Sequence, residues 1–399
     1  MEHLHTCLAC GNAPTIHFME KFSAFVDTEV SPWFRPLDTL RRRIEPLVNP
    51  ILDKLELWMM GACNTFHIGK FLDQADHRTP MRAVCFWESA KKRGIHMYEF
   101  RLFGRPFDLY IATYKDRVIV FDGLPRPGTH SSASLDWMDD KAIIHKRFSA
   151  TGIPVAMGGV ARSKRQAIEI FTKTPHPVII KPNIGSRSRH TTIHITTEAD
   201  LVRAYRCAKE LSPWVIVEQE LTGRVYRATV IGGSVVGVLR RDPAHVVGNG
   251  HLSIRTLVEI ENKNPLRRGP IFHLLPVNTT STKYLSKQGL DWNTIPKAGQ
   301  YIELGDKASR GAGGSTADVT DSVHPDNMAL FEKIGRVLDD PLVGIDFIIE
   351  DMSRSWKTQK NCGVIECNSM PFIDLHHYPL YGKPRDAAGA LWDLIYKNS

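Results

Sequence analysis

The sequence predicts an α/β protein in which strands and helices build more than one packed unit. From about residue 139 onward, short apolar runs bounded by Gly and Pro alternate with helical stretches, which is typical of a mixed α/β class. The chain has 399 residues, enough for two or three domains of ordinary size. Apolar residues make up 42% and charged residues 24%, a globular composition that excludes a disordered or fibrous protein.

Residues 1–135 form the first predicted unit, a separate N-terminal α/β domain. Apolar residues recur every three or four positions over residues 37–60, which predicts a helix. Pro46 and Pro50 are expected to kink or split this helix, because proline removes a backbone donor and clashes with the preceding turn.

Two strands are expected at residues 107–114 and 117–121, followed by a linker rich in Pro, Gly and Ser at 125–134. No motif in this N-terminal unit identifies its role. We expect it to supply a substrate-docking face or a dimer interface.

Residues 136–396 form the second predicted unit. Helices are expected near 139–151 and 163–173 and from Thr197 onward, and strands near 177–181, 191–196 and 214–218. Thr197 and Asp200 have the spacing of an N-terminal helix cap. A hairpin is expected to join strands at 227–230 and 234–239 around Gly232 and Gly233.

Hydropathy, charge and cysteine content indicate the cellular compartment and the class of ligand. No apolar run approaches the roughly 18 residues of a membrane span, and residues 1–12 lack the apolar core of a secretory signal. Seven mostly single cysteines favour a reducing compartment, so we expect a cytoplasmic protein. The formal charge of +8 suits an anionic ligand such as a nucleotide, whereas no basic stripe with interleaved aromatics predicts nucleic-acid binding.

Oxygen-bearing side chains on two C-terminal strands predict a metal site. Glu366 and Asn368 are two residues apart on a strand and therefore point to one face. Asp346 can reach the same point from the neighbouring predicted strand. Three hard oxygen ligands suit Mg²⁺, with Mn²⁺ as an alternative. The plainer interpretation is that these acids occupy ordinary positions at strand ends.

Lysines predict where phosphates would bind. Lys181 ends a strand and precedes a turn containing Gly185 and Ser186, so a point charge and backbone donors would lie together. Lys141 is a second candidate. The alternative for each is a solvated lysine at the surface.

An extended segment at the end of a predicted strand could offer backbone groups to the edge of an adenine. It consists of Glu218, Gln219, Glu220 and Leu221. The alternative is a polar strand exit without a ligand.

These candidates occur in one order along the chain, and at this point the sequence resembles the ATP-grasp superfamily. Three longer stretches, 241–268, 313–327 and 368–385, are similar to the ATP-grasp module shared by cyanophycin synthetases and fused two-activity glutathione synthetases. The resemblance covers roughly residues 139–396.

The resemblance implies an ATP-grasp fold and an ATP-dependent carboxylate–amine ligase that proceeds through an acyl-phosphate. It implies a lid-type nucleotide-binding subdomain at 136–225 and a C-terminal subdomain with the metal site at 226–396. The residue roles that it implies are phosphate binding by Lys141, Lys181, Gly185 and Ser186, an adenine pocket at Glu218, Gln219, Glu220 and Leu221, and magnesium ligation by Asp346, Glu366 and Asn368. It also places Arg227 and Arg241 at the phosphates or acyl-phosphate, and these two residues would be catalytic together with Lys181. The loop containing Gly313 and Gly314 would lie near the amine.

The sequence departs from this family at several positions. Ser188 and His190 stand where the glycine-rich lid usually has Gly, and Val225 stands where an acid usually contacts ribose. Gly305 and Gly311 align with an Arg and a Ser that cyanophycin synthetases use for substrate, so substrate identity is not transferred. The second catalytic halves of both relatives are lacking, so we expect one ligation.

Other interpretations stay open beside a ligase of small carboxylates and amines. One is a nucleotide-binding module that has lost catalysis. Another is a ligase that modifies a peptide or protein, or that uses aminoacyl-tRNA. Relatives imply a homo-oligomer.

The cysteines of the N-terminal unit suggest a weaker metal hypothesis. Cys7 and Cys10 have the Cys-x2-Cys spacing of zinc ligands, and Cys63 with His67 has the spacing Cys-x3-His. These four could hold a structural zinc ion. The default interpretation is free thiols.

Overall fold

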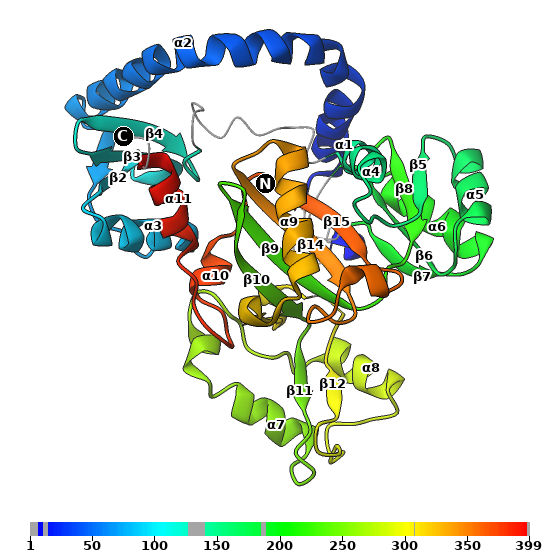
Figure 1. Ribbon diagram of the computed structural model, residues 1–399. Helices are drawn as coiled ribbons and strands as arrows, with labels where there is room; N and C mark the ends of the chain where they lie inside the picture. The colour runs from blue at the N-terminus through cyan, green and yellow to red at the C-terminus, as the bar shows by residue number, and fades with distance from the viewer. Residues whose placement is uncertain (1–6, 11–14, 127–139, 185–188, 307, 397–399) are drawn as a thin grey trace.

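The computed structural model describes residues 7–10, 15–126, 140–184, 189–306 and 308–396 (Figure 1). Within them the strands form three larger sheets and one two-stranded ribbon. Every strand pair within these sheets is antiparallel. The mixture of helices and sheets confirms the predicted α/β (α+β) class. No helix in the described part of the chain is both long and apolar enough to cross a bilayer.

The N-terminal region consists of a helical arm and a sheet. Its helical elements are η1 (Leu8–Cys10), α1 (His17–Phe25), the π-helical η2 (Val26–Val30), α2 (Ser31–Thr65) and α3 (Met81–Lys92). Its sheet has the order β1 (Gly69–Leu72), β2 (His96–Leu102), β3 (Arg105–Tyr114) and β4 (Arg117–Asp122). Figure 1 shows α2 arching over the molecule from the four-stranded sheet to the neighbourhood of α4 (Lys141–Ala150).

Of the two outcomes expected at Pro46 and Pro50, a split does not occur, because α2 is helical throughout from Ser31 to Thr65. Proline can bend a helix without ending it, and α2 follows a curved path in Figure 1. The expected strands at 107–114 and 117–121 are β3 and β4. Most of the expected linker, from residue 127, lies outside the described residues.

The second sheet and its helices form the region after the linker. The strand order is β5 (Gly158–Ala161), β8 (Val215–Gln219), β6 (Val178–Pro182) and β7 (Thr192–Ile195). The helices are α4, α5 (Lys164–Lys173) and α6 (Glu198–Ala208). The Thr197 hydroxyl accepts a hydrogen bond from the Asp200 amide at 3.2 Å, as its spacing predicts.

The central sheet has the order β13 (Ser315–Asp318), β10 (Ser234–Asp242), β9 (Arg224–Ile231), β14 (Leu342–Ile349) and β15 (Gly363–Asn368). Gly232 and Gly233 have φ of 59° and 85° and close the expected β9–β10 hairpin, because a two-residue turn of this hand requires positive φ. Helix α9 (Pro325–Leu338) covers one face of the sheet, and its Phe331 packs against Phe347 with ring centroids 5.5 Å apart.

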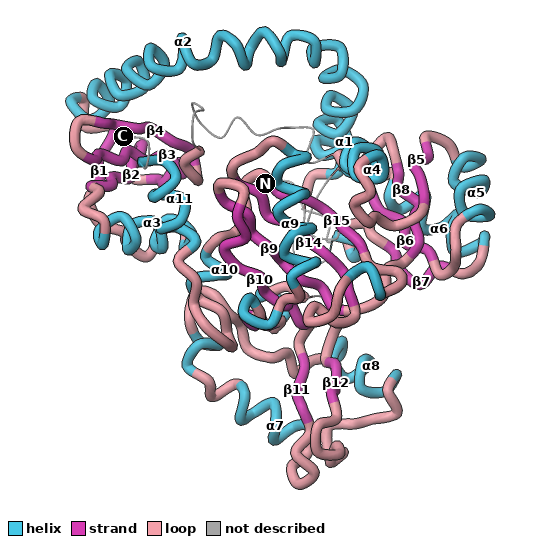
Figure 2. Tube along the Cα trace, viewed as in Figure 1, coloured by secondary structure: helices cyan, strands magenta, loops and turns pink. Residues whose placement is uncertain are grey.

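A smaller region projects from the central sheet in Figure 2. It contains the ribbon of β11 (His245–Val247) and β12 (Tyr301–Glu303) with α7 (Ile254–Glu261) and α8 (Thr279–Lys287). The short helical segments η4 (Pro265–Arg268), η5 (Arg310–Ala312), η6 (Thr320–Ser322) and η7 (Trp356–Thr358) lie in loops, and α10 (Asp374–His377) precedes the last helix.

That last helix, α11 (Ala387–Tyr396), packs against α3 of the N-terminal region. The buried Trp392 ring meets Phe86 edge-on at 5.1 Å, and its Nε1–H donates to the Phe86 carbonyl at 3.1 Å. The C-terminal end of the chain thus completes the core of the N-terminal sheet. The division at residue 135 stays a prediction.

Candidate active site

The three predicted metal ligands lie on the neighbouring strands β14 and β15. Asp346 pairs in register with Glu366, and Asn368 lies two residues further along the same strand. The Asn368 amide nitrogen is 3.5 Å from a carboxylate oxygen of Glu366. Asp346 is buried, whereas Glu366 and Asn368 are partly exposed. The antiparallel register therefore brings the triad together, as the strand pattern predicts.

Two arginines meet this triad from the other side of Asp346. Arg227 lies opposite Asp346 on β9, and its Nε and Nη2 both donate to the carboxylate, the second at 2.8 Å. Arg241 on β10 donates to the same carboxylate at 3.3 Å. Two guanidinium groups on β10 and β9 thus lie next to two carboxylates on β14 and β15.

Electrostatics keep Asp346 ionised. Burial acts to raise its pKa, but the charges of Arg227 and Arg241 outweigh burial and hold the pKa at about 2. The same pairing raises the pKa of the fully buried Arg227 against its desolvation. Both groups are therefore charged at neutral pH.

The predicted phosphate lysines lie on the second sheet. Lys181 on β6 is buried and forms an ion pair with Glu218 on the adjacent strand β8. The Lys141 ammonium donates to the Asn183 carbonyl at 3.4 Å. Strand β6 thereby brings both lysines to the same end of the sheet. Gly185 and Ser186, with Ser188, lie outside the described residues.

Two residues that sequence reasoning missed fix Lys141. The Asp140 carboxylate caps α4 by accepting from the amides of Ala142 and Ile143, at 2.9 and 3.2 Å. The Asn183 side chain donates to Asp140 at 3.1 Å and accepts from Ala142 at 3.1 Å. The start of α4 is therefore tied to the end of β6. Asp140 immediately before Lys141 is a capping signal in the sequence, whereas the partner Asn183 is 43 residues away.

The predicted adenine segment, residues 218–221, spans the end of β8 and the residues just after it. The Gln219 and Glu220 amides already donate to the carbonyls of Met157 and Pro177, at 2.7 and 2.9 Å. The Glu220 carboxylate accepts from both the amide and the ring of His194. Internal hydrogen bonds therefore hold this segment in place. Leu221 follows as the next backbone position that could face a base.

The second sheet is joined by direct contacts to the strands that carry the candidate metal ligands. The Val364 amide on β15 donates to the Pro154 carbonyl at 2.9 Å, and Thr222 donates to the Asn361 carbonyl at 3.1 Å. The Gln219 side chain also donates to the Asn361 side chain, at 2.9 Å. The segment after β8 thus borders β15, which carries Glu366 and Asn368.

Gly313 and Gly314 lie where a side chain would not fit. A Cβ at Gly314 would come within 2.9 Å of the carbonyl oxygens of Ser309 and Asp242, and Gly313 has a φ of 84°. Both glycines thus have a structural reason for their identity. The loop still reaches the site, because Arg241 donates to the Ala308 carbonyl at 3.3 Å.

The predicted zinc ligands are only partly brought together. Cys7 and Cys10 lie beside His17 and His190, whereas Cys63 and His67 do not join them. Cys63 is at the far end of the 35-residue helix α2 and borders Gly69. Sequence spacing cannot show that a rigid helix separates the two pairs. None of the seven cysteines forms a disulfide.

Searches against known proteins find relatives that match part of the chain. No protein-family model matches the chain. The cyanophycin synthetase of Trichormus variabilis is 32% identical over 265 residues, which is 65% of this chain and 29% of that protein. The glutathione biosynthesis bifunctional protein of Clostridium perfringens is 35% identical over 186 residues, 46% of this chain and 24% of that protein. The chain spans less than a third of the length of these two relatives.

A solved structure extends the likeness to the fold. The crystal structure of a bifunctional glutathione synthetase from Pasteurella multocida matches with a TM-score of 0.61 and 24% identity, covering 80% of this chain and 44% of that one. At this identity the match shows a shared fold.

Proposed function

Because the chain has the ATP-grasp fold and is related in sequence to cyanophycin synthetases and bifunctional glutathione synthetases, we propose that it is an ATP- and magnesium-dependent carboxylate–amine ligase. It would join the two substrates through an acyl-phosphate and release ADP and phosphate. The observation that carries the proposal is the register of Arg227, Asp346 and Glu366 across three adjacent strands. This register gathers carboxylates and guanidinium groups at one point of the sheet.

The donor set at this point fits magnesium. Asp346 and Glu366 offer carboxylate oxygens and Asn368 offers an amide oxygen, which are the hard ligands that magnesium prefers. Each Asp346 oxygen accepts from arginine but keeps further lone-pair capacity, because an ionised carboxylate has about four acceptor sites. When bound there, the ion would neutralise phosphate charge and orient the phosphate chain.

The protein residues contribute position and charge. In this proposal Lys141 and Lys181 hold the phosphates from the second sheet, and the segment Glu218–Leu221 borders the adenine. Arg227 and Arg241 stabilise the negative charge that develops as a phosphoryl group moves to the substrate carboxylate. Fixed groups of this kind accelerate the reaction because they need no reorganisation during transfer.

The proposed division of labour follows the two regions. Residues 136–225 would carry the nucleotide, and residues 226–396 would carry the metal and the acyl-phosphate. The loop that ends at Gly314 would border the amine, because Arg241 contacts its Ala308 carbonyl and its Arg310 pairs with Asp374 at 2.8 Å. The substrates would be amino acids or peptides.

A phosphate-release screen tests the proposal. The full chain with ATP and Mg²⁺ is assayed against amino acids, dipeptides and aminoacyl-tRNA, singly and in pairs, and products are identified by mass spectrometry. We expect release that requires both a carboxylate and an amine. Nucleotide binding without turnover across the whole panel would favour the lapsed binding module, and turnover only with aminoacyl-tRNA would favour a ligase that uses charged tRNA.

A further inference from the structure

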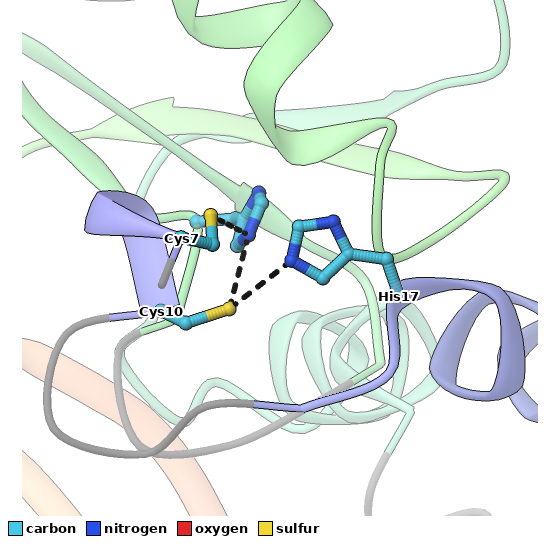
Figure 3. A group of neighbouring side chains, drawn as sticks. Cys7, Cys10 and His17 are labelled. Carbon is cyan, nitrogen blue, oxygen red and sulfur yellow. Dashed lines mark hydrogen bonds between the residues drawn. The ribbon is translucent and has the colours of Figure 1, made fainter. Parts of the chain in front are cut away.

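Four potential metal ligands converge where the N-terminal arm meets the second sheet. Among the described residues, only Cys7, Cys10, His17 and His190 form a Cys and His cluster whose ligand atoms all lie within 4.8 Å of one another. Figure 3 shows the Cys7, Cys10 and His17 side chains pointing toward one centre. The Nε2 atom of His190 completes the group. Cys10 and His190 are buried, with 2% and 1% of their surface exposed.

The separations between these atoms suit a tetrahedral ion. The Cys10 Sγ lies 3.3 Å from the His17 Nε2 and 3.4 Å from the His190 Nε2, and the Cys7 Sγ lies 3.5 Å from the His190 Nε2. Zinc bonds of about 2.0–2.3 Å in a tetrahedron place neighbouring ligand atoms roughly 3.3–3.8 Å apart. Three pairs of atoms therefore already have the required spacing.

The outer nitrogens of both histidines have acceptors, which leaves Nε2 to face the cluster. The His190 Nδ1 lies 2.7 Å from the Cys207 carbonyl, and the His17 Nδ1 lies 3.4 Å from the Glu210 carboxylate. A proton on each Nδ1 satisfies these partners and leaves each Nε2 as a bare lone pair, as in metal-bound histidines.

With a proton on each Nδ1, hydrogen bonds alone do not satisfy this arrangement. The thiol of Cys7 can donate to His190, and the thiol of Cys10 can donate to His17. The contact of 3.4 Å between the Cys10 sulfur and the His190 Nε2 then joins two lone pairs without a proton between them. A cation at the centre would attract each of these lone pairs and so stabilise the arrangement.

The backbone holds the ligands in this arrangement. The Cys10 amide donates to the Cys7 carbonyl at 3.1 Å in the tight turn η1, and the His190 amide donates to the Ala9 carbonyl at 2.9 Å. His190 has a left-handed φ of 52°, which is uncommon for a residue with a side chain. That strained conformation directs a buried imidazole at two cysteines from the N-terminal arm.

We propose that Cys7, Cys10, His17 and His190 bind a structural zinc ion that ties the N-terminal arm to the strand β7 side of the second sheet. Two thiolates and two imidazoles form a closed set of four protein ligands, which is typical of structural rather than catalytic zinc. Soft sulfur ligands disfavour magnesium and calcium. The ion would also give His190 a role at a position where the family's lid usually has Gly.

Two further contacts join the N-terminal arm to the second sheet close to the proposed zinc site. The Arg189 guanidinium donates to the Glu20 carboxylate of α1 at 2.8 Å. The Trp214 Nε1–H donates to Glu29 of η2 at 2.6 Å. The zinc ion would thus anchor the first turn of an arm that continues into the long helix α2.

Metal analysis of the full chain tests the proposal. The protein is purified without a polyhistidine tag, and its zinc is measured by inductively coupled plasma mass spectrometry. We expect about one zinc per chain in the wild type. Cys10→Ser and His190→Asn should lose most of it. Cys63→Ser, which changes a cysteine outside the cluster, should retain it. Equal zinc in the wild type and Cys10→Ser would overturn the proposal.

A second measurement does not depend on the folding of variants. Wild-type protein stripped by a chelator is titrated with Co²⁺, and tetrahedral coordination with thiolate should produce intense visible bands and sulfur-to-metal charge transfer. Zinc should protect Cys7 and Cys10 from alkylation, as measured by peptide mass spectrometry. Absence of both the bands and the protection, or a Cys7–Cys10 disulfide in protein isolated under reducing conditions, would refute the zinc site.

Discussion

Asp346 lies directly opposite Arg227 across β14 and β9 and accepts two hydrogen bonds from its guanidinium group. Both residues are buried, with 4% and 5% of their surface exposed. The pair therefore fixes one candidate metal ligand and one candidate phosphate ligand in a single unit. The contribution of this pair to stability and its role in catalysis can be tested separately.

Removing one partner of the buried pair should strongly destabilise the protein. Asp346→Asn should lower the free energy of unfolding by about 3–5 kcal/mol, because a charged Arg227 would be left without its partner. The same change in the exposed pair of Arg93 and Asp393 should cost less than about 1 kcal/mol. Urea unfolding followed by circular dichroism measures both. A small loss for Asp346→Asn would mean that Arg227 is already compensated elsewhere.

Removing the whole pair should be less harmful to stability than removing half of it. The double variant Arg227→Met with Asp346→Leu should recover part of the stability lost in Asp346→Asn, because apolar groups leave no buried charge. It should still show no ATP-dependent turnover. Recovery of turnover together with stability would exclude a catalytic role for the pair.

Glu366→Gln should abolish turnover while preserving the fold. The amide nearly conserves the volume but removes the negative charge that attracts a divalent ion, so we expect a loss of several orders of magnitude in rate. Glu350→Gln changes an exposed acid just after β14 and should have little effect. Phosphate release at saturating Mg²⁺ compares the two variants. Similar activities would remove the metal assignment.

Lys181→Met should weaken nucleotide binding more than it lowers the rate of turnover by the nucleotide-bound protein. Lys181 is buried beside Glu218, so its loss leaves a carboxylate near the proposed phosphates and should reduce ATP affinity by about 10–100-fold. Lys173→Met at the exposed end of α5 is the matched control. Calorimetric titration with a non-hydrolysable ATP analogue measures the affinities. Unchanged affinity in Lys181→Met would place the phosphates elsewhere.

His376 should make the protein less stable in mild acid. Burial, assisted by the charge of Arg227, lowers its pKa to about 3, whereas an unfolded histidine has a pKa of about 6.5. Between these two pKa values only the unfolded state takes up a proton at His376. The free energy of unfolding therefore decreases as the pH is lowered, by up to about 1.4 kcal/mol per pH unit. The loss begins below about pH 6.5.

The variant His376→Gln isolates this contribution. Gln loses or weakens the 2.7 Å contact with the Thr229 hydroxyl, so it should be less stable at pH 7. Its unfolding free energy should nevertheless fall less steeply between pH 7 and 5. Parallel slopes in urea unfolding would show that other groups, including His377 with its lowered pKa, account for the pH dependence.

The strand pattern predicted that Asp346, Glu366 and Asn368 lie together, because strand geometry is local. Residues two apart on β15 share a face, and the apolar run around Asp346 marks the neighbouring strand. The turn at Gly232 and Gly233 was equally predictable, because positive φ favours Gly. These features depend on a few adjacent residues.

Long-range partners could not be predicted in the same way. His190 joins Cys7 and Cys10 across about 180 residues, and no spacing in the sequence connects them. Cys63 instead seemed a suitable partner from its spacing, although a helix of 35 residues carries it away. The packing of α11 on α3 likewise depends on how the regions assemble, which periodicity within each helix does not specify.

Hydroxylamine trapping tests the central claim most directly. The protein is incubated with ATP, Mg²⁺, hydroxylamine and a panel of amino acids and peptides, and hydroxamates are identified by mass spectrometry. An acyl-phosphate would react with hydroxylamine even if the natural amine is absent. We predict ADP release and one hydroxamate, both dependent on a specific carboxylate and both lost in Glu366→Gln. Tight binding of Mg·ATP with no hydroxamate from any carboxylate would contradict the ligase assignment.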